Sequence, residues 1–278
     1  MVKVMAVNAG SSSLKFQLIN MPSEEVITSG LVERIGQEVG NFVIKVNGEK
    51  IQTQTPIPDH QVAVDLLLNA LVDHHIVESL EEIDAVGHRV VHGGEDFDDS
   101  VVVDEEAVKK VADLSELAPL HNPANLVGVR AFMKNLPNTP MIGVFDTAFH
   151  QSMKEESYIY ALPYEWYTKY GVRKYGFHGT SHRFINKTIS EFMKRDDLKV
   201  ISCHIGSGAS LAAIDSGKVV DTSMGFTPTP GVVMGTRAGD FDVSILPYVM
   251  KKENKNIHEK YLEFSNELDK CNKYLDKI

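Results

Sequence analysis

The chain has 278 residues, of which 43% are hydrophobic and 24% are charged, a composition ordinary for soluble globular proteins. Its 28 basic and 38 acidic side chains leave a formal net charge of -10, and such an acidic surface repels phosphate backbones and anionic membranes. Nucleic acid and lipid are therefore excluded as main partners. No apolar run approaches the ~20 residues of a membrane span, and the length suggests one large domain or two smaller ones.

The N-terminal segment and the cysteines favour a cytoplasmic protein. The segment MVKVMAVNAG is too short and too soon interrupted by polar residues to act as a signal peptide. Cys203 and Cys271 are far apart and lack CxxC spacing, which argues against a disulfide framework or a zinc site.

The first half of the chain predicts an antiparallel group of strands followed by alternating helices and strands. Asn47-Gly48 lies between two strand-like runs and is a strong hairpin signal. The predicted strands here are residues 2–8, 13–19, a run beginning near 26, the two arms of 41–55, and 85–94, which runs into a Gly-rich turn; the predicted helices are 60–76 and 103–118.

The second half continues with a helix over 121–135, in which Asn122 suits the N-cap and Pro123 the first helical position. A strand over 140–149 and a helix over 179–195, capped by Thr180 or Ser181, follow. Residues 199–223 read as strand, Gly turn, strand, turn, strand. This layout resembles residues 2–20 and indicates an internal duplication.

The last segment, 251–278, contains no Gly or Pro and carries a heptad-like apolar seam. The seam comprises Ile257, Tyr261, Phe264, Leu268, Cys271, Leu275 and Ile278. We expect one amphipathic helix over about 257–276 that lies on a core; self-association through the seam is the alternative.

The turn Asn8-Ala9-Gly10-Ser11-Ser12-Ser13-Leu14-Lys15 has the composition of an anion site. Gly10 permits close ligand approach, hydroxyls and amides supply donors, and Lys15 adds a positive charge. The chemistry suits polyphosphate, although the GxxxxGK[ST] spacing of a P-loop is absent. A simple polar hairpin turn is the alternative interpretation.

Two further candidates follow predicted strands. Arg89, at the end of a strand, can fork onto a carboxylate or a phosphoryl group. His88 and His92 have i, i+4 spacing, but on a strand that spacing separates the rings, so packing is favoured over zinc ligation. Asp146 ends an apolar strand and could hold Mg²⁺ through water, or simply form an Asx turn.

The remaining candidates lie later in the chain. His178 precedes a predicted helix and can donate a hydrogen bond to a charged oxygen. The turn His204-Ile205-Gly206-Ser207-Gly208 mirrors the first loop and is a second candidate phosphate contact. Arg237 ends a run, 222–236, that carries no charge, so its guanidinium is expected to meet an anion.

Taken in order, these segments closely resemble the acetate kinase family. The motifs are NAGSSSLKF, GHRVVHGGE, APLHNPAN, FDTAFH, YGFHGTSH, HIGSGAS and DTSMGFTPTPGVVMGTRAGD, covering residues 1 to about 250. The resemblance implies an α/β fold of two related actin-like (ribonuclease H-like) domains with mixed sheets. It predicts an N-terminal domain over 1–150, a partial second domain over 151–250 and a divergent tail over 251–278. Family members are longer, so we expect a C-terminally truncated member with an incomplete second domain.

The resemblance implies reversible phosphoryl transfer from ATP to acetate, with Mg²⁺, giving acetyl phosphate and ADP. Acetate is already ionised at neutral pH, so no general base is required. Arg89 would clamp the carboxylate, Arg237 the phosphoryl group, and His178 would donate to the equatorial oxygens. Asp146 is expected to anchor Mg²⁺ or water, although the family resemblance is often read with it as an acid/base residue. Arg89, Asp146, His178 and Arg237 are thus the predicted catalytic residues.

The remaining implied residues fall into three sets: Asn8 and Asp146 at the metal; Ser11, Ser13, Lys15, His204, Ile205, Gly206, Ser207 and Gly208 at the phosphates; and Val91, Leu120 and Pro228 in an apolar pocket for the substrate methyl. The family also implies a homodimer. Propionate or butyrate kinase is the near alternative, and a catalytically inactive truncated remnant is the alternative of another class.

Overall fold

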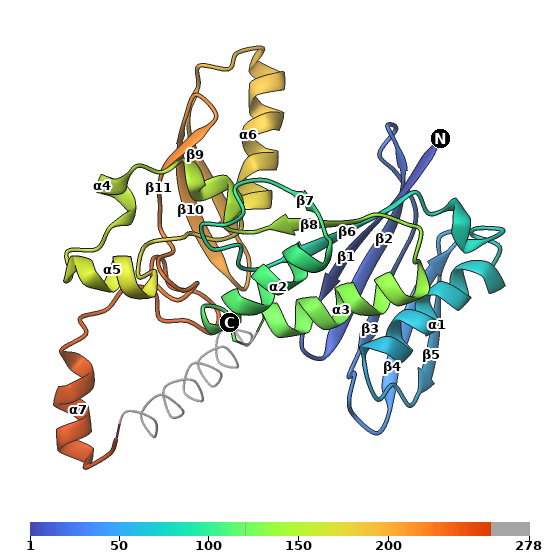
Figure 1. Cartoon of the computed structure of the whole chain (residues 1–278), viewed down its shortest axis with the longest axis horizontal. Helices are drawn as coiled ribbons and strands as arrows, with labels where there is room; N and C mark the ends of the chain where they lie inside the picture. The colour runs from blue at the N-terminus through green and yellow to red at the C-terminus, as the bar shows by residue number, and fades with distance from the viewer. Residues whose placement is uncertain (120, 257–278) are drawn as a thin grey trace, which may run out of the picture. The chain divides into compact units, whose positions relative to one another are not determined.

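The computed structural model of the protein describes residues 1–119 and 121–256 (Figure 1). The chain divides into two units, Met1–Ala148 and Phe149–Ile278. The predicted amphipathic helix over 257–276 lies outside the described residues. Within the described ranges, every helix falls short of the length and apolar character that a membrane crossing needs.

An eight-stranded mixed sheet forms the first unit. Its strands are β1 (Val2–Ala9), β2 (Ser13–Met21), β3 (Glu25–Glu33), β4 (Gly40–Val46), β5 (Glu49–Thr55), β6 (Ala85–Val90), β7 (Val101–Val102) and β8 (Met141–Phe145), in the order β5-β4-β3-β2-β1-β6-β8-β7. β1 to β5 pair antiparallel, β1–β6 and β6–β8 pair parallel, and β7 joins β8 antiparallel. The α/β class and the antiparallel start are thereby confirmed.

The predicted hairpin at Asn47-Gly48 is confirmed. Val46 pairs with Glu49, and the two residues between them have φ angles of 52° and 87°. Positive φ at both central residues is the requirement of a type I′ turn, which explains why Asn and Gly stand there.

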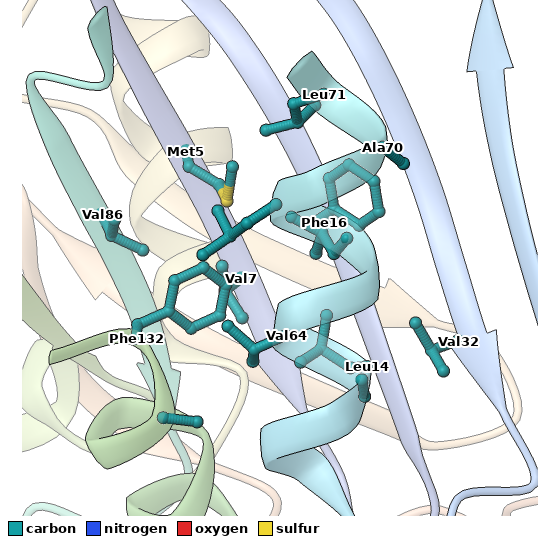
Figure 2. Close-up of a cluster of buried hydrophobic side chains, with 14 of the residues drawn as sticks. Met5, Val7, Leu14, Phe16, Val32, Val64, Ala70, Leu71, Val86 and Phe132 are labelled. Atoms are coloured by element: carbon teal, nitrogen blue, oxygen red, sulfur yellow. The ribbon is translucent and has the colours of Figure 1, made fainter. Parts of the chain in front are cut away.

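One face of this sheet packs against helices α1 (His60–Asp73) and α3 (Asn122–Asn135). Figure 2 shows this core: Met5, Leu14 and Val86 from the strands face Leu71 of α1 and Phe132 of α3. Strand residues on this face are buried and their neighbours are more exposed, the period-two alternation that the sequence carries. Burying one such large side chain contributes about 1.5–3 kcal/mol.

The first unit also contains α2 (Glu105–Asp113) and the 3₁₀ turns Leu80–Glu82 and Leu114–Glu116. α2 was predicted over the longer range 103–118. It begins after Asp104, whose side chain accepts a hydrogen bond from the Ala107 amide and caps the helix. A separate core cluster joins Val108 and Val111 of α2 to Val90, Phe97 and Phe145.

The second unit has a three-stranded sheet in the order β11-β10-β9. Its strands are β9 (Lys199–Ile205), β10 (Ala209–Asp215) and β11 (Lys218–Thr222); its helices are α4 (Glu155–Tyr158), α5 (Tyr164–Tyr170), α6 (Gly179–Met193) and α7 (Ile245–Glu253), and a 3₁₀ turn spans Ala148–Ser152. Both strand pairs are antiparallel, so the mixed sheet expected for this unit is not seen among its described residues.

Both Gly-rich turns join antiparallel strands, and their loops differ in length, 10–13 in the first and 206–208 in the second. In the first unit the Gly10 amide donates to the Ser13 carbonyl at 2.8 Å, between antiparallel β1 and β2. In the second unit the Gly206 amide donates to the Gly208 carbonyl at 3.1 Å, between antiparallel β9 and β10. The likeness that the sequence indicated therefore exists at the level of the hairpin.

Candidate functional site

The strand register brings Asn8, Arg89 and Asp146 together in the first unit. On β1 and β6 the residues beside them, Val7 and Val90, are buried in the core, so Asn8 and Arg89 point to the opposite face of the sheet. Asp146 directly follows β8, which is parallel to β6, and its amide donates to the Val90 carbonyl at 3.0 Å. Three segments that are distant in the sequence therefore meet at the carboxyl ends of parallel strands.

Arg89 and Asp146 form a forked ion pair. Arg89 Nη2 lies 2.6 Å from Asp146 Oδ2, and Arg89 Nε lies 3.1 Å from both carboxylate oxygens. Burial works against the charge of Arg89, but the hydrogen bonds and the negative charge of Asp146 outweigh it and raise the pKa of Arg89. The carboxylate side chain is 3% exposed and the arginine side chain 41%, so a buried Asp146 holds an arginine side chain that is still partly exposed.

Asn8 and Asp146 were predicted at the metal, with Asp146 holding Mg²⁺ through water, and this stays a prediction; direct coordination by these oxygens is disfavoured by their contacts with Arg89. Both Asp146 oxygens face Arg89, and Asn8 Oδ1 lies 3.4 Å from Arg89 Nη1. A cation placed against these oxygens would meet the guanidinium charge. Within residues 1–119 and 121–256, no group of three or more His, Cys, Asp and Glu side chains could hold a metal ion.

The serine turn after β1 is held by hydrogen bonds to other parts of the unit. The Ile35 amide donates to the Ser12 carbonyl at 3.0 Å, and His60 Nε2 lies 2.7 Å from the Gly10 carbonyl. Ser11 is exposed, and Lys15 is exposed opposite Asn8 in the β1–β2 ladder. The turn is thus a fixed, donor-rich loop, as an anion site requires.

Two asparagines of α3 hold neighbouring loops through side-chain hydrogen bonds, a role that the sequence did not indicate. Asn125 Nδ2 donates to the Ala9 carbonyl at 2.7 Å, and its Oδ1 accepts from the Val91 amide at 3.1 Å. Asn122 was predicted as the N-cap of the helix, and this is wrong, because His121 takes that place. The Asn122 side chain instead accepts from the His92 amide at 3.1 Å and donates to the His92 carbonyl at 3.0 Å.

His88 and His92 are packing residues of the first unit. His88 Nε2 lies 3.4 Å from Met141 Sδ, and its ring meets the edge of Phe132. His92 Nδ1 accepts from the Gly94 amide at 3.0 Å. Burial lowers the pKa of each to about 4, so both are neutral near pH 7.

In the second unit, His178 lies beside the second Gly-rich turn. His178 precedes α6 with a left-handed φ of 60°, so the predicted caps Thr180 and Ser181 are wrong and the helix begins at Gly179. Its ring stacks on that of His204, with centroids 4.0 Å apart and planes at 28°. His204 Nδ1 in turn lies 2.9 Å from Ser181 Oγ.

Arg237 reaches the same turn. A Cβ built on Gly208 would lie 3.5 Å from Arg237 Nη2 and 3.5 Å from His178 Cε1, so the guanidinium and the imidazole flank this glycine. Arg237 Nη1 donates to the Pro228 carbonyl at 2.9 Å. In the described part of the chain Arg237 has no ion pair, and burial lowers its pKa.

The loop that carries Arg237 is tied to the glycine turn. The Gly235 amide donates to the Ser207 carbonyl at 3.0 Å, and the Asp240 amide donates to the Gly231 carbonyl at 2.8 Å. Gly231 has a φ of 97°, and a Cβ there would lie 2.5 Å from the Ser223 carbonyl oxygen, so the close approach requires glycine.

The predicted apolar pocket stays a prediction. Leu120 lies outside the described residues, Val91 is buried in the first unit, and Pro228 belongs to the second. The same holds for the expectation that Arg89 and Arg237 act in one cleft, because each belongs to a different unit.

These features define an α/β protein with two glycine-turn hairpins: Arg89 contacts Asn8, at the end of the strand before the first turn, and Arg237 lies beside Gly208 of the second. Guanidinium groups and glycine-turn amides are groups that proteins use to bind anions. The sequence matches the acetokinase family over residues 3–268, and the chain belongs to that family. Acetate kinases of Anoxybacillus flavithermus (strain DSM 21510 / WK1) and Bacillus subtilis (strain 168) are each 59% identical over 261 residues. These alignments cover 93% of this chain and 66% of each relative, so the chain spans just under two thirds of their length.

Solved structures agree with this assignment. The acetate kinase of Porphyromonas gingivalis superposes with a TM-score of 0.89 at 46% identity, covering 93% of this chain and 66% of that one. A propionate kinase from Francisella tularensis subsp. tularensis SCHU S4 has a TM-score of 0.89 at 38% identity, covering 95% and 68%.

Proposed function

We propose that the chain catalyses reversible transfer of the γ-phosphoryl group of ATP to acetate, giving acetyl phosphate and ADP. Family membership and the names of the relatives support this activity. The observation that carries the proposal is the pair of half-buried arginines: Arg89, held by a buried carboxylate, and Arg237, without an ion pair in the described residues. Two anions that repel each other need such cations to meet.

The acceptor needs no activation. Acetate resembles a Glu side chain, with a pKa of about 4.3, and is a carboxylate nucleophile at neutral pH. Arg89, whose side chain is partly exposed, binds this carboxylate. Asp146 positions the guanidinium through its hydrogen bonds to Arg89, and no residue needs to accept a proton because acetate is already ionised.

Residues of the second unit bind the phosphoryl donor, ATP. Arg237 binds the transferring phosphoryl group, and His178 donates to its equatorial oxygens as charge spreads there. Backbone amides of residues 204–208 contact the nucleotide phosphates, and Ser11, Ser13 and Lys15 contact phosphate from the first unit. Mg²⁺ enters with the nucleotide, since it keeps water and phosphate ligands and needs few from protein.

Propionate kinase activity is the second candidate, favoured by the likeness to the Francisella propionate kinase. One methylene in an apolar pocket is worth only about 1–3 kcal/mol, so we expect some use of propionate. The family also leads us to propose a homodimer that works in the cytoplasm with ATP and ADP.

Trapping with hydroxylamine tests the activity of the chain as it stands. Incubation with Mg-ATP, acetate and hydroxylamine converts any acyl phosphate into a coloured hydroxamate, and we expect colour that depends on both substrates. A chain that is folded by circular dichroism but forms no hydroxamate would contradict the proposal and favour the inactive remnant. Replacing acetate by propionate at equal concentration compares the two candidate acceptors.

Arg237→Ala tests the donor side. Loss of one donor to a transition-state oxygen commonly costs about a hundredfold or more in rate, and we expect turnover to fall at least that far. Arg130→Ala, at an exposed position of α3, is the matched control and should keep the rate. Near-normal turnover of Arg237→Ala would show that the assignment is wrong.

A further inference from the structure

Behind His178, a chain of hydrogen bonds runs into the interior of the second unit. His178 Nδ1 lies 2.9 Å from Ser210 Oγ, and the same hydroxyl lies 2.8 Å from His182 Nε2. The other ring nitrogen, His182 Nδ1, lies 2.9 Å from Ser202 Oγ. His182 and Ser210 are fully buried and Ser202 is 2% exposed.

The chemistry of these groups favours two arrangements of protons. Burial, with the charge of His204, lowers the pKa of His182 to about 4, so at neutral pH its ring carries a single N–H. Each serine also has a single O–H. A hydroxyl could also accept from both imidazoles, but the buried O–H of Ser210 would then lack an acceptor among the described residues, which is costly. Ser210 therefore donates to one imidazole and accepts from the other, and this direction decides the tautomer of His178.

In the first arrangement, Ser202 donates to His182 Nδ1, His182 Nε2 donates to Ser210, and Ser210 donates to His178 Nδ1. A neutral His178 then carries its proton on Nε2. In the reverse arrangement His178 Nδ1 donates to Ser210, and His178 could offer a proton from Nε2 only as a cation.

The surroundings disfavour that cation. The guanidinium of Arg237 and the ring of His178 lie on either side of the same residue, Gly208. The His204 ring stacks on the His178 ring, with centroids 4.0 Å apart. A second positive charge beside a half-buried arginine without an ion pair in the described residues is repelled. The first arrangement lets His178 donate while it stays neutral.

We propose that Ser202, His182 and Ser210 form an ordered hydrogen-bond chain that holds His178 as the neutral tautomer with its proton on Nε2. His182 and Ser210 are then positioning residues, which touch no reacting atom. The choice of this tautomer rests on the proposed phosphoryl transfer, which needs a proton donor at His178 Nε2, because the reverse arrangement would also leave His178 neutral, with its proton on Nδ1.

Long-range ¹H–¹⁵N spectra of the full chain at pH 7.5 test the tautomer, because they separate protonated from unprotonated ring nitrogens. His178 is assigned by the signal that disappears in His178→Gln. We expect Nε2 protonated and Nδ1 unprotonated in both His178 and His182. A proton on Nδ1 of His178, with or without one on Nε2, would overturn the proposal.

Variants test whether these hydrogen bonds set the tautomer of His178. Ser210→Ala should move the His178 Nδ1 resonance, since that nitrogen loses its donor, and Ser202→Ala should give His182 a mixture of tautomers. Ser181→Ala is the matched control: it removes the hydroxyl beside His204 and should leave the His178 resonances unchanged. Unchanged His178 resonances in Ser210→Ala would refute the proposed hydrogen-bond chain. If that variant does not fold, the spectra of the wild type and of Ser202→Ala test the proposal instead.

Kinetics separate this inference from the proposed function. Partners of this kind typically contribute a factor of about 10–100, so Ser210→Ala should lower kcat by that amount with KM for acetate little changed. A folded chain with the expected tautomer but no hydroxamate would keep the hydrogen-bond chain and reject the proposed activity.

Discussion

Single side chains near the first turn show how much depends on partners that are remote in the sequence. A recognisable sequence motif contains each of Asn8, Arg89 and Asp146. The parallel pairing of β6 and β8 accounts for the contact between Arg89 and Asp146. Asn125 carried no such signal, because an asparagine near the start of a helix is ordinarily a local cap. Only the fold reveals that it joins the end of β1 to the chain after β6.

Asn125→Ala should lower the free energy of unfolding by about 1–3 kcal/mol for each buried partner left without a hydrogen bond, here the Ala9 carbonyl and the Val91 amide. Urea denaturation measures the change. Asn138→Ala, at an exposed position, should stay within about 0.5 kcal/mol of wild type. Equal stability of the two variants would contradict the bridging role.

At the scale of the elements, the spacing of apolar residues predicted where the helices lie, but the residues suited to capping did not always predict where each helix begins. Asp59 and Asp104 cap α1 and α2 through their own side chains. Asn122 and Thr180 do not cap their helices: α3 starts after His121, and α6 starts after a left-handed His178. In both cases the residue type allowed a cap, but side-chain contacts and backbone conformation set by the fold prevailed.

Asp59→Ala should destabilise the protein by about 1 kcal/mol, because the Val62 amide loses the carboxylate oxygen that lies 2.9 Å away. Asp59→Asn keeps an acceptor at the same place and should recover most of that loss. Urea midpoints of the two variants and wild type provide the measurement. A cost for Asn as large as that for Ala would mean that the charge, and not the hydrogen bond, matters.

For the whole molecule, buried neutral histidines link stability to pH. The pKa values of His88 and His92 are lowered to about 4 by burial, whereas an unfolded histidine titrates near about 6.5. The unfolded chain therefore binds more protons between these values, and stability must fall as the pH drops from about 6.5 to about 4. Each such histidine can contribute up to about 1.4 kcal/mol per pH unit across that window.

His88→Leu should flatten this dependence. The free energy of unfolding is measured in urea at half-unit steps between pH 7 and pH 4. Its decrease over this range should be smaller in the variant than in wild type, by up to about 3 kcal/mol. His75→Asn is the control, since it removes an exposed imidazole at a left-handed position that Asn tolerates. An equally steep dependence in His88→Leu would contradict a neutral, buried His88.

The sequence by itself determined the features that depend on neighbours along the chain. The alternation of β1 and β2, the Asn47-Gly48 turn, the glycine hairpins and the candidate residues of the first turn could all be predicted, because strand period and turn chemistry are local. Only the tertiary structure decided the pairing of Arg89 with Asp146, the bridge made by Asn125 and the chain from Ser202 to His178. Those bonds join residues between 20 and 116 positions apart, and no local pattern encodes which buried polar groups will satisfy one another.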